Sequence, residues 1–328
     1  MSLTYDHGWS GRKENAWEQD IERLLRDSAV PMDFDWTPHY MGDGEIRYGR
    51  DSLKPRGISF FGHGYYHINA DALSEDSARA NFLLCKTSML AHGIKAVSYA
   101  YAGGYGFDAK TRRACKDAGF LSARLFSMTQ SPLIIPDSET APRDWFSLPT
   151  VPMFSAEYHT GNVLLRGTDY RSAVHSTQEL VPYLDETVRR GAWLILTYHA
   201  INNTPDGTYR FRDFQTDVSA IKARHIWCTG MNTVILYLKE RIATRLQTTL
   251  QRANNGAVEE IRIHADDGLP NDFYNVPLTV QVLMPHSWQE KNIIALQNGV
   301  ECAVQRIDKQ KLLVFLRPTE QECVLHTE

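Results

Sequence analysis

Short apolar, β-branched or aromatic runs recur along the N-terminal three quarters of the chain, separated by longer stretches with helical spacing. This alternation predicts strands connected by helices, that is, an α/β fold. We expect strands at residues 3–5, 57–61, 96–101, 192–198 and 225–228. We expect helices at residues 14–27, 75–92, 109–117, 177–190 and 232–250. Ser74 and Gly93 flank the second of these helices as its predicted N-terminal and C-terminal caps.

The pattern changes after residue 250. Asn254, Asn255 and Gly256 end the last helix, and short alternating runs follow. These runs predict strands at residues 259–264, 276–283, 292–296 and 311–316. The C-terminal part therefore reads as a small all-β domain, which could bind carbohydrate, form an oligomer contact or cap the larger domain.

Composition excludes several classes of protein. Of the 328 residues, 43% are hydrophobic and 23% are charged, which is typical of a globular chain. A net charge of −4 gives no electrostatic footprint for nucleic acid. The five cysteines form no C-x-x-C pair, so we expect reduced thiols. With no secretion signal and no membrane-spanning apolar run, a cytoplasmic protein is expected, although a trimmed signal would look the same.

Reactive side chains gather where the predicted strands end. Asp6 and His7 follow the first strand, His63 and His67 the second, a glycine-rich loop at 102–106 the third, and His199 the strand at 192–198. In barrels and open α/β sheets the carboxyl ends of the strands build the functional site. We therefore expect these groups to share one site.

The His63-Gly-Tyr-Tyr-His67 spacing lets two imidazoles face one metal ion from a single turn. Taken alone, this spacing is also typical of two histidines in an exposed loop. An isolated Asp6-His7 pair is likewise typical of a turn or cap.

Taken together, these segments resemble the polysaccharide deacetylase family, the NodB-homology domain of the carbohydrate esterase type. Residues 3–9 (LTYDHGW) resemble its T-F-D-D motif, and His63–His67 resembles its H-[ST]-x-x-H motif. Residues 99–106 (YAYAGGYG) resemble the third motif, and 194–199 (LILTYH) the fifth. The resemblance covers about residues 2–241 in the family's order.

The resemblance implies a distorted (β/α) barrel at residues 1–245, followed by a β-sandwich-like accessory domain at 246–328. It also implies a divalent metal, commonly zinc, held by an aspartate and two histidines, and catalysis of amide hydrolysis by a base and an acid. In this chain Asp6 would be the base, His63 and His67 metal ligands, and His199 the acid that protonates the leaving amine.

Three departures from the family pattern bear on this assignment. His7 stands where the family has its aspartate ligand, and imidazole is itself a competent zinc ligand. Alternatively the metal site is weakened, or Asp6 becomes the third ligand and no base remains. The arginine that orients the base in the family falls at about Ala100, so orientation of Asp6 must come from elsewhere or be lost. The fourth motif is either Asp144-Trp145 or absent, with those residues in a surface loop.

Aromatic residues near the motif loops, Trp9, Tyr66 and Tyr105, suit the apolar faces of sugar rings. We therefore expect a metal-dependent hydrolase that deacetylates an N-acetylated carbohydrate. The alternatives are a catalytically impaired relative that binds glycans and an amidase acting on a non-sugar amide. No nucleic-acid or membrane partner is expected, and a homo-oligomer is left open.

Overall fold

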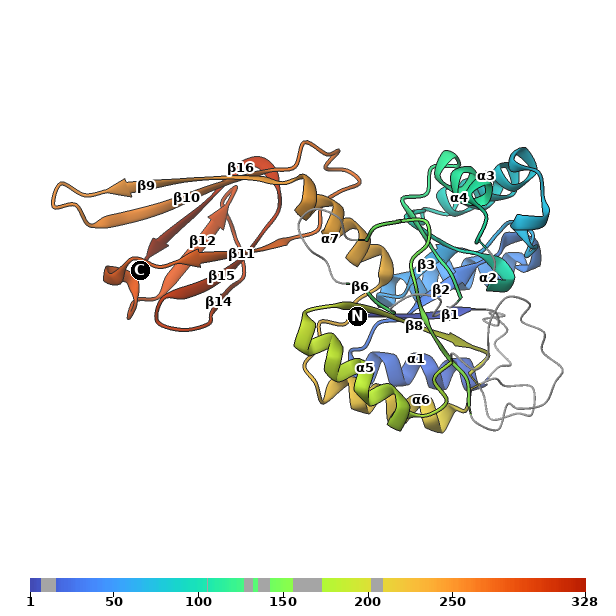
Figure 1. The fold of residues 1–328 in the computed structure, drawn as a ribbon. Helices are drawn as coiled ribbons and strands as arrows, with labels where there is room; N and C mark the ends of the chain where they lie inside the picture. Colours follow the sequence, from blue (N-terminus) through green and yellow to red (C-terminus); the bar gives the residue numbers. More distant parts are fainter. Residues whose placement is uncertain (7–15, 105, 127–131, 135–141, 156–172, 202–208) are drawn as a thin grey trace. The chain divides into compact units, whose positions relative to one another are not determined.

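The computed structural model describes residues 1–6, 16–104, 106–126, 132–134, 142–155, 173–201 and 209–328 (Figure 1). The chain divides into two compact units, Met1–Ile235 and Leu236–Glu328. The division falls within helix α7 (Met231–Ala243), whereas the motif order placed it after residue 245.

A largely parallel sheet forms the centre of the first unit. In spatial order its main strands are β5 (Ser122–Arg124), β4 (Ser98–Ala100), β3 (Ser59–Gly62), β2 (Asp33–Trp36), β1 (Ser2–Asp6) and β8 (Trp193–His199). Strand β7 (Val151–Met153) pairs in parallel with β8, and the short β6 (Leu133–Ile134) pairs with β8 in the antiparallel sense. The α/β prediction is confirmed.

The sheet curls into a distorted barrel. In a flat sheet β1 and β5 would lie about 19 Å apart, because three strands separate them. The side chains of Asp6 on β1 and Arg124 on β5 nevertheless form an ion pair. The gap between β5 and β8 is bridged by the segment that leads into β7: Leu148 pairs with Arg124, and Val151 pairs with Leu196.

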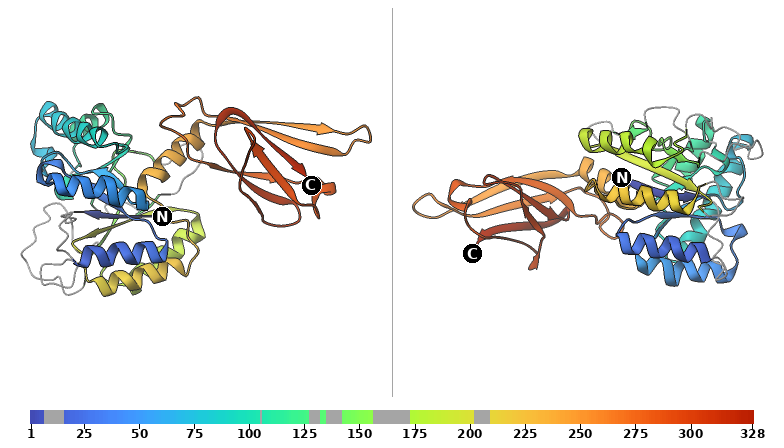
Figure 2. Two further views of the ribbon diagram at one scale, coloured as in Figure 1. Left: turned by 180° about the vertical axis from the view of Figure 1, so that it is seen from behind. Right: turned by 90° about the horizontal axis from the view of Figure 1, so that it is seen from below.

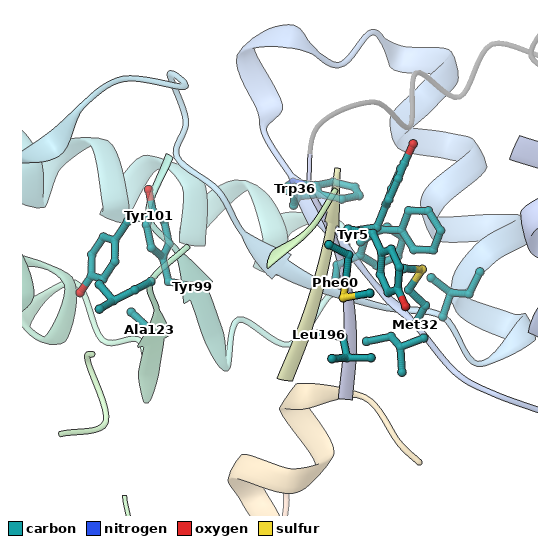
Figure 3. Close-up of a cluster of buried hydrophobic side chains, with 14 of the residues drawn as sticks. Tyr5, Met32, Trp36, Phe60, Tyr99, Tyr101, Ala123 and Leu196 are labelled. Carbon is teal, nitrogen blue, oxygen red and sulfur yellow. The ribbon is translucent and has the colours of Figure 1, made fainter. Parts of the chain in front are cut away.

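The barrel strands alternate between an apolar and a polar face. Aromatic and aliphatic side chains on the outer face pack under the helices; Figure 3 labels Tyr5, Met32, Trp36, Phe60, Tyr99, Tyr101, Ala123 and Leu196 among them. Many of the residues between them are polar, and those that are also buried include Thr4, Asp6, Ser98, Ser122, Arg124 and Thr197. Since successive side chains of a strand point to opposite faces, the barrel interior holds these polar groups beside apolar residues such as Phe61 and Ile195.

Helices cover the outer face of the sheet. They are α1 (Ala16–Ser28), α2 (Asp43–Tyr48), α3 (Glu75–Ala91), α4 (Ala109–Asp117), α5 (Thr177–Arg190) and α6 (Phe211–Lys222). Helices α1, α5 and α6 lie together on one side, and α3 and α4 lie together on the other (Figures 1 and 2). The predicted N-terminal cap of α3 is confirmed, because the Ser74 hydroxyl accepts a hydrogen bond from the Ser77 amide at 3.2 Å. At the other end the cap residue is His92, and the predicted Gly93 follows it with φ +69°.

The second unit consists of the end of α7 followed by an all-β region, as expected for the C-terminal part of the chain. One sheet has the order β13 (Val300–Glu301), β12 (Ile293–Gln297), β16 (Thr319–Thr327), β10 (Val258–Asp266), β9 (Arg245–Arg252). The other has the order β11 (Leu278–Leu283), β15 (Lys311–Leu316), β14 (Val304–Arg306). Residues of both sheets, such as Ile261 and Val314, share one apolar core, which makes this unit a sandwich.

Two predicted elements are wrong. The helix expected at 232–250 ends at Ala243, and the following residues form β9, which pairs with β10 around the turn at 254–256. Leu246 and Leu250 are exposed, so their helical spacing buries no face. The segment 225–228 forms no strand; it meets the chain start through single backbone hydrogen bonds, one of them from the Met1 amino group to the Trp227 carbonyl.

Candidate functional site

The two histidines of the H-x-x-x-H motif come together directly after β3. Their Nε2 atoms lie 3.1 Å apart, and their ring centroids lie 4.8 Å apart. His63 is buried, and its Nδ1 lies 2.9 Å from the carbonyl oxygen of Ala100 on β4. A backbone carbonyl at this distance accepts a hydrogen bond from a protonated Nδ1. The lone pair is then on Nε2, the atom that lies next to His67 Nε2.

Three neighbouring residues fold this loop back on itself. At Gly62 a Cβ would meet the rings of Phe120 and Tyr99 at 2.9 Å, so the end of β3 packs closely against the aromatic core. Gly64 has φ +93°, which side chains rarely tolerate, and it turns the chain toward His67. Asn81 of α3 then holds the Tyr66 peptide: its Oδ1 accepts from the amide at 2.8 Å, and its Nδ2 donates to the carbonyl at 3.3 Å.

The histidine pair is compatible with a shared metal ion. Two nitrogen ligands about 2.1 Å from one ion, at roughly 90–109° to each other, lie roughly 3.0–3.4 Å apart. The 3.1 Å separation of the Nε2 atoms falls in this range. The Nδ1 contact of His63 is also the outer hydrogen bond that metal-binding histidines make. Within the described ranges, no group of three His, Cys, Asp or Glu residues is placed to hold a metal ion, and His7 lies outside those ranges.

Asp6 and His199 end two adjacent strands. They are register partners in the parallel β1–β8 pair. Two residues earlier, the hydroxyls of Thr4 and Thr197 lie 3.1 Å apart on the inner face. Because side chains repeat every second residue, Asp6 and His199 face the same interior. Asp6 is buried, and His199 is partly exposed at the rim.

Arg124 supplies a partner that the sequence analysis did not identify for Asp6. Its side chain is fully buried at the end of β5, and its guanidinium donates to the Asp6 carboxylate. The same guanidinium lies over the ring of Phe61, 4.9 Å from the ring centroid. The sequence signal that was missed is a lone charge within the largely apolar stretch FLSARLF at 120–126.

Asp35 is a second buried carboxylate that the sequence analysis missed, because β2 was not predicted. It lies in the strand between those of Asp6 and His63 and accepts a hydrogen bond from Thr37 Oγ1 at 3.0 Å. Asp33, two residues earlier, is also buried, and burial raises its pKa to about 6. The alternation Asp-Phe-Asp-Trp is the pattern that could have revealed a strand with two inward carboxylates.

Behind His199, a buried carboxylate ties β8 to the outer helices. Asp217 of α6 accepts hydrogen bonds from the hydroxyls of Tyr198 at 3.0 Å, Tyr209 at 2.6 Å and Thr177 at 2.6 Å. Burial raises the pKa of Asp217 to about 6. Tyr198, the aromatic residue before His199, is therefore a core residue with a structural partner.

Aromatic rings line the exposed side of the histidine loop. Tyr66 is 41% exposed and Tyr40 is 65% exposed. The ring of His39 lies between them, 4.7 Å from the centroid of Tyr66 and 4.9 Å from that of Tyr40. The other two aromatic residues expected to contact substrate, Trp9 and Tyr105, lie outside the described residues.

Comparison with known proteins gives structural similarity only. No protein-family model matches the chain, and no curated protein matches it. A putative polysaccharide deacetylase from Mycobacterium smegmatis is 15% identical, with a TM-score of 0.49 over 77% of this chain and 93% of that one. A family 4 carbohydrate esterase from Streptomyces lividans, solved in complex with acetate, is 14% identical, with a TM-score of 0.41 over 70% and 91%.

A CE4 family pseudoenzyme from Bacillus anthracis is also similar, at 14% identity and a TM-score of 0.44 over 71% of this chain. The present chain spans 64% of the length of that protein. At identities this low, the similarity concerns the fold alone.

Proposed function

We propose that this protein is a metal-dependent hydrolase of amide bonds that removes the acetyl group from an N-acetylated carbohydrate. The observation that carries the proposal is the pair of His63 and His67 Nε2 atoms, 3.1 Å apart, at the strand ends where Asp6 and His199 also lie. This arrangement combines metal ligands with two groups that can move protons.

The proposed roles of Asp6, His63, His67 and His199 rest on their place at the strand ends, and that of His7 rests on the sequence alone. His63 and His67 would hold the metal, with His7 as the third ligand expected from the sequence. When bound, a divalent cation such as Zn²⁺ polarises the amide carbonyl and acidifies a water molecule. Asp6 accepts a proton from the attacking water, and His199 donates a proton to the leaving nitrogen as the C–N bond breaks. The products are acetate and the free amine.

A carbohydrate substrate is supported by the exposed rings next to the histidine loop. Tyr66 and Tyr40 offer apolar faces with polar edges, which match the faces of sugar rings.

The proposal is tested by metal content and acetate release. Purified wild-type protein is expected to contain about one zinc or other divalent ion per chain and to release acetate from N-acetylglucosamine oligomers. The double variant His63→Ala/His67→Ala should lose both. The control is His264→Ala, which removes a histidine from β10 in the second unit and should keep both.

Full metal occupancy in the double variant would refute the assignment of these ligands. Oligosaccharide binding without acetate release, in metal-loaded wild-type protein, would instead support a glycan-binding protein without turnover. Release of acetate only from simple aryl amides would point to a non-sugar substrate.

A further inference from the structure

We propose that Arg124 positions the Asp6 carboxylate for proton transfer. Arg124 lies on β5, beside Ala100 of the neighbouring strand β4. The inference rests on the proposed function, in which Asp6 is the base. Arg124 is a positioning residue, because it acts through Asp6.

The location of Arg124 follows from the strand register. Ala100 and Arg124 are register partners in the parallel β4–β5 pair. Register partners of neighbouring strands lie about 5 Å apart and direct their side chains to the same face. The small side chain of Ala100, which is fully buried, therefore leaves the interior space next to Arg124 open for the guanidinium.

Three contacts fix the guanidinium. One terminal nitrogen donates to Asp6 Oδ1, the other donates to the Leu125 carbonyl at 3.4 Å, and the group lies over the ring of Phe61. The guanidinium is planar, and it is held by the Phe61 ring against its face and by hydrogen bonds from both terminal nitrogens. The N–H group that donates to Asp6 therefore points in one direction only. The carboxylate that accepts this bond is therefore held in one orientation.

The ion pair also explains how a charged arginine occupies the barrel interior. Arg124 has no exposed surface, and Asp6 is 4% exposed. Buried charges require opposite charges or hydrogen-bond partners. Asp6, the last residue of β1, supplies the opposite charge to Arg124. The carboxylate that neutralises the guanidinium is therefore also the proposed base.

The main test is Arg124→Met, which keeps an unbranched apolar stem and removes the guanidinium with its donors. The zinc content should stay at the wild-type level, because the ligands are intact. For N-acetylglucosamine oligomers kcat should fall about 10²-fold, as expected when a catalytic group is misplaced, and KM should change by less than about threefold.

A second variant restores the guanidinium from the neighbouring strand. Arg124→Ala/Ala100→Arg places an arginine one strand away on the same face and should recover at least about tenfold in kcat over Arg124→Ala. Leu184→Ala, in the buried face of α5, is the control for loss of stability and should keep the wild-type kcat. If Arg124→Met does not fold, Arg124→Lys keeps the charge without the planar fork and should still lower kcat.

Several outcomes would overturn the inference: wild-type kcat in Arg124→Met or Arg124→Lys, loss of zinc together with activity in Arg124→Met, or no recovery in the swapped variant. If wild-type protein releases no acetate, the proposed function fails by itself. The positioning role is then decided by crystal structures of wild type and Arg124→Met, and an Asp6 carboxylate in the same orientation in both would overturn it.

Discussion

Asn81 holds the middle of the histidine loop through two hydrogen bonds to the Tyr66 peptide. The loop joins two imidazoles whose spacing must stay near 3 Å for both to contact one ion. At the scale of single residues, the candidate metal site therefore depends on a buried amide of α3 as well as on the histidines.

We expect Asn81→Ala to weaken metal binding about 10- to 100-fold, the usual cost of removing a group that orients a metal ligand. Competition with a chromogenic zinc chelator measures this affinity. Arg79→Ala, two residues earlier on the same helix and exposed, is the control and should bind zinc as the wild type does. Equal affinities of the two variants would show that Asn81 has no part in holding the loop.

Tyr66→Ala should raise KM for N-acetylglucosamine oligomers about 2- to 10-fold at unchanged kcat, because an exposed ring contributes about 0.5–1.5 kcal/mol of stacking. Steady-state kinetics over a series of chain lengths measures the change. Tyr274→Ala, a tyrosine in the second unit, is the control. A fall in kcat without a change in KM would contradict a role in binding the sugar.

At the scale of elements, Asp217 joins β8 to the helices outside the barrel. Its three hydroxyl partners come from the start of α5, from β8 and from the residue before Arg210. Burial raises its pKa from 3.8 to about 6, so the folded protein binds a proton at this carboxyl more readily than the unfolded chain does. The stability that this proton provides is complete below about pH 4 and is lost as the pH rises through 6.

Asp217→Asn removes this dependence. The unfolding free energy of wild type minus that of Asp217→Asn should fall by up to about 3 kcal/mol between pH 4 and pH 7. Urea titrations of both proteins at several pH values measure the difference. Asp33, whose pKa is also raised to about 6, is present in both proteins and cancels. A difference that stays constant or rises with pH would mean that Asp217 keeps an ordinary or lowered pKa.

At the scale of the whole molecule, the two units have separate apolar cores that share no residue among those described. No helix in the described part of the chain is both long and apolar enough to cross a membrane. All five cysteines are free thiols, so no disulfide links residues of either core. Trp288 is the largest side chain buried in the core of the second unit.

Trp288→Ala should destabilise the second unit by about 3–5 kcal/mol and leave the zinc content and acetate release of the first unit unchanged. Calorimetry combined with zinc analysis tests this. Loss of zinc in this variant would show that the second unit contributes to the site.

The sequence by itself determined the α/β class, the strands that carry Asp6, His63 and His199, and the all-β end of the chain. These features depend on local hydrophobic period and on caps such as Ser74, which nearby residues specify. It also placed His63 and His67 together, because only three loop residues separate them.

Only the tertiary structure decided the partner of Asp6. Arg124 is 118 residues away in the chain and reaches Asp6 because the sheet curls until β1 and β5 face each other. Curvature is a property of the whole sheet, and β5, with three residues, is too short to show a period. The same holds for Asp35 on the four-residue β2 and for Asp217, whose partners meet only when α5, α6 and β8 pack.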